Sequence, residues 1–187
     1  MAVERFVIQQ VVPDKEQPAI PDGLEIRWHR SSDLETLCRA HLRRDYLNMR
    51  LAAGARIAVA LLDGRPVCWG FYQTERCEQQ NWLTLAMAPD LACIFAVYTD
   101  PEHRGKRIPS MLHSFAARHL ADQGIRRFVW MISTDNTPSL RIAVNMDALD
   151  LLRVSVLRLG KLIFIKIGNG WPVGRWGRSG RYVLKIE

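Results

Sequence analysis

The sequence lacks any apolar run close to the ~20 residues that a bilayer-spanning helix requires. Its N-terminal stretch, MAVERFVIQQ, also lacks the basic start and apolar core of a secretion signal. The 4 cysteines are scattered without a Cys-x-x-Cys pair, which argues against a zinc site or a disulfide framework and favours reduced thiols. We therefore expect a soluble, cytoplasmic protein with no metal and no membrane partner.

What the sequence does contain is enough apolar material for one core. Of its 187 residues, 48% are hydrophobic, which suffices for one well-buried domain and is short for two. Lysine and arginine number 26 against 19 aspartate and glutamate residues, so the formal net charge is +7. A basic protein favours polyanionic partners, but nucleic acid, anionic lipid and phosphorylated cofactors all fit that description. Charge alone does not choose among them.

The two ends of the chain differ from its middle. Residues 5–12 have the composition of a strand and precede a proline-rich connector, so we interpret residues 1–23 as an N-terminal extension, either an added edge strand or a loose arm. Residues 169–187 interleave glycines and aromatics with Arg175, Arg178 and Arg181. We interpret this basic C-terminal extension as an added hairpin or a partly ordered segment in preference to an RNA-binding tail. Residues 24–168 are then the main domain.

Within the main domain, the spacing of apolar residues predicts a mixture of strands and helices. Ser32 and Glu35 form a capping-box pattern at the start of a first helix, and His41 is interpreted as a packed structural residue. Tyr46, Met49 and Ala53 continue a helical spacing to about Gly54, which predicts two short helices or one bent one. The predicted strands are Leu24–Trp28, Arg56–Leu62, Pro66–Gln73, Cys93–Thr99, Phe128–Ile132, Leu151–Leu157 and Leu162–Ile167, with Trp82–Met87 as a further strand or a loop on the sheet.

The stretch TDPEHRGKRIPSML, residues 99–112, joins one of these strands to a helix that we expect from Pro109 to about Gln123. The start of a helix presents unpaired N–H groups and a partial positive charge, which suits a phosphate. Arg104, Lys106 and Arg107 add mobile positive charge to the same turn. Because strand Phe128–Ile132 follows the helix, the three elements form a right-handed βαβ unit.

The order of the predicted elements resembles that of the GNAT superfamily of acyl-CoA-dependent N-acyltransferases. Residues 99–106 are similar to the end of the family's fourth strand and its pyrophosphate loop, whose pattern is Arg or Gln, two residues, Gly, one residue, Gly or Ala. Residues 136–143, NTPSLRIA, are similar to the Asn-x-x-Ser start of its fourth helix. The resemblance covers about Leu24–Ile167. It implies an α+β fold in which a mixed, mostly antiparallel twisted sheet with a central βαβ unit is flanked by helices.

The resemblance also implies a reaction, the direct transfer of an acyl group from acetyl-CoA or another acyl-CoA to the amine of a small-molecule acceptor. In the family, backbone N–H groups of the fourth strand stabilise the thioester oxygen, the loop holds the pyrophosphate, and the fourth helix contacts the pantetheine arm. The cofactor-binding residues carried over in this way are Val97, Tyr98, Thr99, Arg104, Gly105, Lys106, Arg107, Pro109, Ser110, Asn136 and Ser139.

The sequence departs from the family pattern at several positions. Arg107 and Pro109 stand where the family has its two loop glycines, so Arg107 gives up conformational freedom and Pro109 removes one N–H donor. Asp147-Ala148 replaces the Gly-Phe pair that ends the fourth helix, which predicts a reshaped corner. Ala143 occupies the position of the tyrosine that often protonates the leaving thiolate.

The catalytic proton carriers are therefore unassigned. No acidic residue lies within Cys93–Thr99, and the nearby polar candidates, each favoured as structural, are Asp90, Tyr72, Tyr98 and His103. Besides the acyltransferase, two other functions stay open: a GNAT-like domain that binds CoA without catalysis, and a basic nucleic-acid-binding module that uses the C-terminal extension. A nucleic-acid partner is the less favoured of these, and the sequence leaves a homodimer open.

Overall fold

The computed structural model describes residues 3–12, 19–40, 42–80, 82–159, 162–170, 173–176 and 182–187, with the backbone alone for residues 173–176. The interpretations of His41, Arg178 and Arg181 concern residues outside these ranges. Among the described residues, no helix is long and apolar enough to cross a membrane. Within the same ranges, no group of three or more His, Cys, Asp and Glu side chains is arranged to hold a metal ion.

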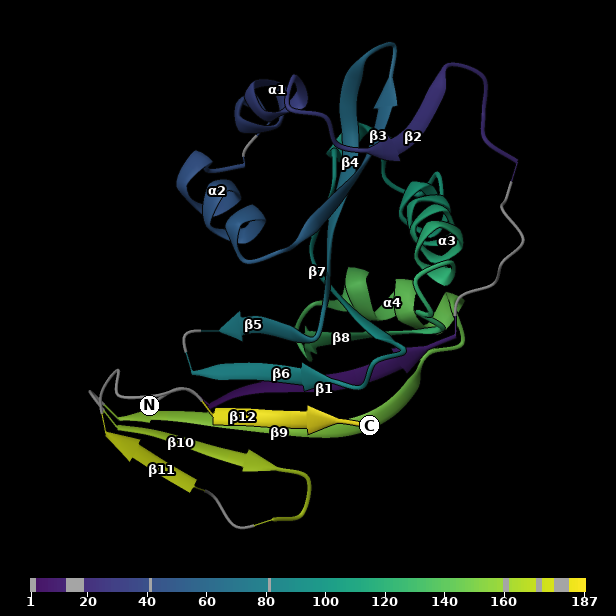
Figure 1. The fold of residues 1–187 in the computed structure, drawn as a ribbon. Coiled ribbons are helices and arrows are strands. Elements are labelled where there is room, and N and C mark those ends of the chain that lie inside the picture. The colour runs from purple at the N-terminus through teal and green to yellow at the C-terminus, as the bar shows by residue number, and fades with distance from the viewer. Residues whose placement is uncertain are drawn as a thin grey trace.

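A nine-stranded sheet forms the body of the protein, in the order β11-β10-β9-β1-β8-β7-β4-β3-β2 (Figure 1). All neighbouring strands are antiparallel except β7 and β8, which run parallel because α3 crosses between them. The strands are β1 Val3–Val11, β2 Leu24–Trp28, β3 Arg56–Leu62, β4 Arg65–Thr74, β7 Leu91–Thr99, β8 Arg127–Ser133, β9 Leu149–Leu159, β10 Leu162–Ile167 and β11 Val173–Trp176. This mixed, mostly antiparallel sheet with its βαβ unit confirms the predicted fold class.

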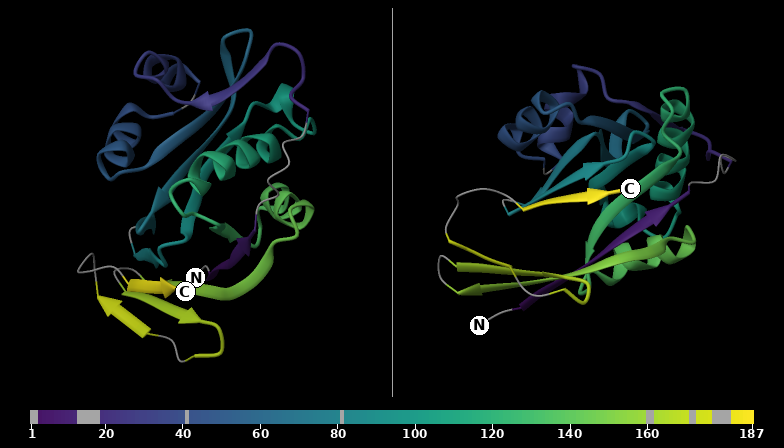
Figure 2. Two further views of the ribbon diagram at one scale, coloured as in Figure 1. Left: turned by 45° about the vertical axis from the view of Figure 1, so that its right-hand side comes forward. Right: turned by 60° about the horizontal axis from the view of Figure 1, so that its bottom comes forward.

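Four helices flank the sheet: α1 Asp33–Arg39, α2 Arg44–Ala52, α3 Ile108–Ala121 and α4 Thr137–Asn145. Figures 1 and 2 show α1 and α2 on one side of the sheet and α3 and α4 on the other. Two separate clusters of buried apolar side chains correspond to these sides, one including Leu37 and Leu47 of α1 and α2, the other including Leu112 and Phe115 of α3. The central strands are thus covered on both faces.

Strand β1 corrects the interpretation of the N-terminus. It lies between β9 and β8 and pairs antiparallel with both, so it is an interior strand and neither an edge strand nor a loose arm. Phe6 and Ile8 pack into one apolar cluster, whereas Val7 and Val11 pack into the other. Such apolar residues on both faces are typical of a strand buried between two layers.

A smaller sheet, β12-β6-β5, accounts for part of the C-terminal extension. Its strands are β5 Arg76–Gln80, β6 Leu83–Met87 and β12 Tyr182–Ile186, and β12 runs parallel to β6. The stretch Trp82–Met87 is therefore a strand, but in a second sheet. Because β11 extends the main sheet while β12 joins the small one, these two strands do not form the added hairpin that was one of the two expected structures of the extension.

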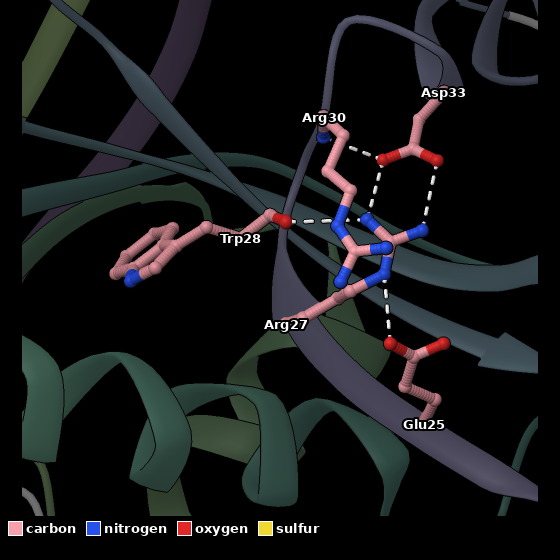
Figure 3. A network of polar contacts seen from close by, with 5 residues as sticks. All are labelled: Glu25, Arg27, Trp28, Arg30 and Asp33. Atoms are coloured by element: carbon pink, nitrogen blue, oxygen red, sulfur yellow. Dashed lines mark hydrogen bonds and ion pairs between the residues drawn. The ribbon is translucent and has the colours of Figure 1, made fainter.

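The start of α1 is fixed by an ion-pair network and not by the predicted capping box. Ser32 makes no capping bond with its side chain. Instead, Asp33 accepts hydrogen bonds from Nη1 and Nη2 of Arg27 at 2.6 and 2.9 Å and from the backbone N–H of Arg30 at 2.6 Å (Figure 3). The Arg27 hydrogen bond lowers the pKa of the Asp33 carboxyl. Strand β2 and helix α1 are thereby held together by a bidentate pair.

Helix α2 is separate from α1, so the structure has two short helices here, and Tyr46 packs against the core. Met49 is 50% exposed and Ala53 is exposed, while Leu47 is fully buried and Arg50 is only 8% exposed. The helical spacing of apolar residues gave no indication that an arginine of this helix is buried. The inward position of Arg50 becomes important for the acceptor side of the site.

Candidate functional site

Strands β7 and β8 separate along their length, which leaves backbone available between them. Among the described residues, β7 pairs with β8 only where Leu91–Cys93 lies opposite Arg127–Val129. In contrast, β7 pairs with β4 as far as Thr99. In the described pairings, residues 94–99 of β7 thus have a strand neighbour on one side only. N–H and C=O groups along such an edge can bond to a ligand.

A β-bulge interrupts β7 in this same segment. Trp69 of β4 pairs with Tyr98 and Phe71 pairs with Phe95, so that Gly70 alone faces both Ala96 and Val97. Ala96 has a φ of 48°, a left-handed conformation that costs a residue with a side chain about 1–3 kcal/mol. Bulges change the direction of the local backbone and are common next to active sites. The predicted oxyanion segment, Val97 to Thr99, begins at this bulge.

Gly70 is needed for the packing behind the bulge. A Cβ atom added there would lie 3.4 Å from Cδ2 of Leu112 and 3.4 Å from Cγ2 of Val97. Both contacts are at the limit of what packed side chains accept, so β7 and α3 approach β4 closely because this residue has no side chain.

The loop after β7 folds back on the end of the strand. Asp100 accepts a hydrogen bond from the N–H of Glu102 at 2.9 Å, which starts a 3-10 turn at Pro101–His103. Nε of Arg104 then donates to the carbonyl of Thr99 at 3.3 Å. The side chains of Arg104, Lys106 and Arg107 are exposed, so the positive charge of the loop is available to solvent.

Arg107 retains the backbone conformation that a glycine would favour. Its φ of 57° and ψ of 16° place it in the left-handed region as the N-cap of α3, and the N–H of Met111 donates to its carbonyl at 3.2 Å. Pro109 lies in the first turn of α3, where a missing N–H breaks no helical bond. The N–H groups of Ile108 and Ser110 have no acceptor within the helix. The two departures from the family pattern therefore preserve the geometry of a helix start that can bind an anion.

The second motif forms the start of α4. Asn136 is its N-cap, and its side-chain oxygen accepts a hydrogen bond from the N–H of Ser139 at 3.2 Å. Because α3 follows β7 and α4 follows the parallel strand β8, both helices begin at the same edge of the sheet. The structure thus brings the two groups of predicted cofactor-binding residues to one edge.

The far end of α4 keeps its corner, contrary to the expectation that Asp147-Ala148 reshapes it. Asp147 adopts a φ of 52°, again the conformation that suits glycine. The N–H of Ala148 donates to the carbonyl of Ala143 at 3.0 Å, and the N–H of Asp147 donates to that of Val144 at 3.1 Å. This pair of bonds is a Schellman motif, the usual glycine-dependent helix ending. Ala143 itself is fully buried.

Two of the four candidate proton carriers have structural roles. Asp90, at the opposite end of β7 from the bulge, accepts hydrogen bonds from Nε and Nη2 of Arg127 at 2.8 Å each, and these lower the pKa of its carboxyl. Tyr72 is fully buried under α3, where its hydroxyl lies 2.7 Å from Nδ1 of His113. Burial raises the pKa of Tyr72 well above its usual range and lowers that of His113 to about 4.

The other two candidates stay close to the loop. Tyr98 lies on the bulged end of β7 and stacks on Trp69 with 4.3 Å between ring centroids. Nδ1 of His103 lies 3.5 Å from the Asp100 carboxylate, in the 3-10 turn. Their positions fit the predicted site, and the structure assigns neither of them a proton-transfer role.

The sequence reasoning missed an aromatic cluster on the side of the sheet that faces α1 and α2. Phe71 stacks on Phe95 with 5.3 Å between centroids, and Tyr46 of α2 meets Phe71 edge-on at 5.9 Å. The guanidinium of Arg50 lies 4.9 Å from the ring centroids of both Tyr46 and Phe95. Alternate aromatics in strands β4 and β7 were the available signal, but they indicated only a core.

The features around the start of α3 could bind a phosphorylated ligand with an extended arm. An exposed basic loop and a helix start offer charge and N–H groups to a pyrophosphate, and the separation of β7 from β8 offers backbone to an extended amide-containing arm. The bulge at Ala96 changes the direction of the β7 backbone within the segment that no longer pairs with β8.

Structural comparison finds similar folds among acetyltransferases. A tandem GNAT protein from the clavulanic acid biosynthesis pathway matches with a TM-score of 0.59 and 16% identity over 82% of this chain and 52% of that one. A putative GNAT-family acetyltransferase from Novosphingobium aromaticivorans matches with a TM-score of 0.59 and 14% identity over 91% and 67%. This chain thus spans about half the length of the tandem protein.

A further structure, that of the aminoglycoside N-acetyltransferase AAC(6')-Iy with CoA, matches with a TM-score of 0.53 and 17% identity over 65% of this chain and 89% of that one. A search of curated protein sequences gave no match. The family model of the acetyltransferase (GNAT) family matches residues 22–144, which include the β7–α3 loop and most of α4. The chain belongs to the acetyltransferase (GNAT) family.

Proposed function

We propose that this protein is an N-acyltransferase that moves an acyl group directly from acetyl-CoA, or another acyl-CoA, to the amine of a small-molecule acceptor. The observation that carries the proposal is the separation of β7 from β8, together with a basic loop that ends in the left-handed N-cap residue Arg107 of α3. Membership of the GNAT family supports the same reaction class.

On the donor side, the chain supplies charge and backbone. Arg104, Lys106 and Arg107, with the N–H groups at the start of α3, bind the pyrophosphate. Asn136 and Ser139 lie at the start of α4, at the edge where the pantetheine arm enters. A bound acyl-CoA supplies an activated acyl group, and the backbone N–H groups of Val97 to Thr99 stabilise the negative charge that develops on its carbonyl oxygen.

The acceptor amine has to lose a proton before it attacks, because an ammonium has no lone pair. Tyr98, on the bulged end of β7, and the His103–Asp100 pair in the following turn can pass that proton to solvent directly or through water. Positioning and backbone electrostatics supply the rest of the rate enhancement. The buried alanine at position 143 leaves the departing thiolate to be protonated from solvent.

The proposal is tested by thermal unfolding with acetyl-CoA. At 100 times the dissociation constant, a ligand that binds only the folded state adds about 2.7 kcal/mol, which raises the Tm of a chain of this size by several degrees. We expect Lys106→Gln combined with Arg107→Gln to reduce the shift. Arg126→Gln, an exposed arginine beyond the other end of α3, is the matched control and should leave the shift unchanged.

Release of the CoA thiol across a panel of small amines separates catalysis from binding alone. A Tm shift without thiol release for any amine would identify a CoA-binding domain that lacks catalysis. The absence of any shift with several acyl-CoAs would contradict the proposal itself.

A further inference from the structure

Arg50 of α2 is a buried cation whose Nε has no hydrogen-bond partner among the described residues. Its side chain is inside the protein, with 8% of the residue exposed. Nη1 donates to the carbonyl of Glu78 at 2.6 Å, but the buried Nε has no partner within the part of the chain that the structure describes. None of the ion pairs between described residues involves Arg50. A guanidinium carries several N–H donors, and one bond satisfies few of them.

The neighbours of Arg50 are rings and thiols. Tyr46 and Phe95 each hold a ring centroid 4.9 Å from the guanidinium carbon. The buried thiols of Cys77 and Cys93 accept hydrogen bonds at 3.1 and 2.8 Å from the side chain of Gln79. The two thiols also interact with each other, and the positive charge of Arg50 acts on both, but neither sulfur accepts a hydrogen bond from Arg50 among the described contacts. No negatively charged carboxylate in the described ranges neutralises the cation.

Such an arrangement is unfavourable in the free protein. Burial of an uncompensated charge costs several kcal/mol, and each cation–π contact returns only about 0.5–2 kcal/mol. A single bond that ties α2 to β5 could be made by a smaller neutral side chain. The rigid fork of an arginine is best explained by a planar anion that binds it from outside the chain.

The position of Arg50 identifies which molecule carries that anion. Phe95, against which the guanidinium packs, directly precedes the bulged residue Ala96, and Tyr98 lies beyond the bulge on the same aromatic side of the sheet. This side faces α1 and α2, whereas the basic loop and α3 belong to the donor side. The anion is thus placed with the acceptor and separated from the CoA phosphates.

We propose that Arg50 binds a carboxylate on the acceptor, and that the aromatic cluster of Tyr46, Phe71 and Phe95 packs against an apolar part of the same molecule. The acceptor is then an amine that also carries a carboxylate. This assignment rests on the proposed acetyl transfer for its meaning, but the carboxylate site itself is testable without any reaction.

The test compares two probes of nearly equal shape, 3-phenylpropionate and the neutral 3-phenylpropanamide, by calorimetric titration of the full chain. We expect the wild-type protein to bind the carboxylate at least about 10-fold more tightly than the amide, since charge-assisted bidentate bonds are the strong ones. Arg50→Gln should abolish the preference. Arg44→Gln removes an exposed arginine from the same helix and should preserve it.

Arg50→Lys provides a second variant that keeps the charge but loses the fork, and it should retain only part of the preference. Equal binding of the two probes by the wild type, or an undiminished preference in Arg50→Gln or Arg50→Lys, overturns the carboxylate site. A parallel titration with CoA separates the two proposals. A carboxylate preference without CoA binding supports the site and contradicts acetyl transfer, whereas CoA binding without the preference refutes the site alone.

Discussion

The buried polar groups on the two sides of strands β4 and β7 differ in whether their hydrogen bonds are satisfied. Under α3, Tyr72 and His113 are both fully buried and satisfy each other through a 2.7 Å hydrogen bond. Under α2, Arg50 is nearly as buried and has an unpaired Nε. The first arrangement is complete without a ligand, and the second is not. Buried polar groups therefore distinguish a structural side of the sheet from a binding side.

Low pH should lower the free energy of unfolding through His113, on the side of the sheet that faces α3. Burial lowers the pKa of His113 to about 4, below its ordinary value of 6.5, so the unfolded chain takes up a proton before the folded one does. This contribution is fully present above pH 6.5 and is lost as the pH falls to 4, by about 3 kcal/mol. Urea unfolding between these two pH values measures it. His113→Gln should flatten the wild-type slope, and an unchanged slope would show that His113 titrates normally.

Removal of one hydroxyl should have the next largest effect. Tyr72→Phe leaves Nδ1 of His113 buried without a partner, which should lower the free energy of unfolding by about 2 kcal/mol at pH 7.5. Denaturant titration measures the loss. The preference for 3-phenylpropionate over its amide should stay as in the wild type, because Tyr72 faces α3. A lost preference would show that the two sides of the sheet are coupled.

Arg107→Gly should separate backbone geometry from charge at the donor loop. Glycine relieves the left-handed strain at a φ of 57°, so the free energy of unfolding should rise by about 1 kcal/mol. Loss of the guanidinium should weaken CoA binding about 5-fold, since a charge-assisted contact to phosphate disappears. Calorimetry with CoA and thermal unfolding measure the two effects. Tighter CoA binding would instead mark Arg107 as an obstruction.

Asp147→Gly should also relieve left-handed backbone strain, at the end of α4, with a smaller gain in the free energy of unfolding. Its φ of 52° also favours glycine, and we expect about 0.5 kcal/mol of added stability. CoA affinity should not change, because this corner lies at the opposite end of the helix from Asn136. A weaker affinity in this variant would mean that the corner contributes to the cofactor site.

The sequence located the loop after β7 and the start of α4, but it did not indicate that Arg50 is buried. The loop at Arg104 and the cap at Asn136 depend on residues close together in the chain, so local patterns sufficed to locate them. Arg50 contacts Glu78 and Phe95 only when α2, β5 and β7 have packed together. A charged residue is ordinarily expected at the surface, so nothing in the sequence was a reason to place it inside. The left-handed Arg107 and Asp147 show a related limit, because tertiary packing held glycine geometry where no glycine stands.

The same reasoning explains the two errors at the ends of the chain. Strand β1 was interpreted as an edge because its neighbours β8 and β9 come more than a hundred residues later, as the 121-residue separation of Gln9 from Trp130 illustrates. The pairing of β12 with β6 joins residues that are 99 positions apart, such as Leu83 and Tyr182. Local composition contains no information on such partners.

The central position of β1 also has a consequence for how the chain folds. The side chain of Gln9 bonds to Trp130 and to Asp150, at separations of 121 and 141 residues, so the main sheet cannot close until most of the chain has left the ribosome. Contacts this distant in sequence slow folding, because a long loop must be ordered before they form. We expect the joining of β1 to β8 and β9 to limit the refolding rate. Stopped-flow refolding, monitored by tryptophan fluorescence and compared with a Gln9→Leu variant, measures that step.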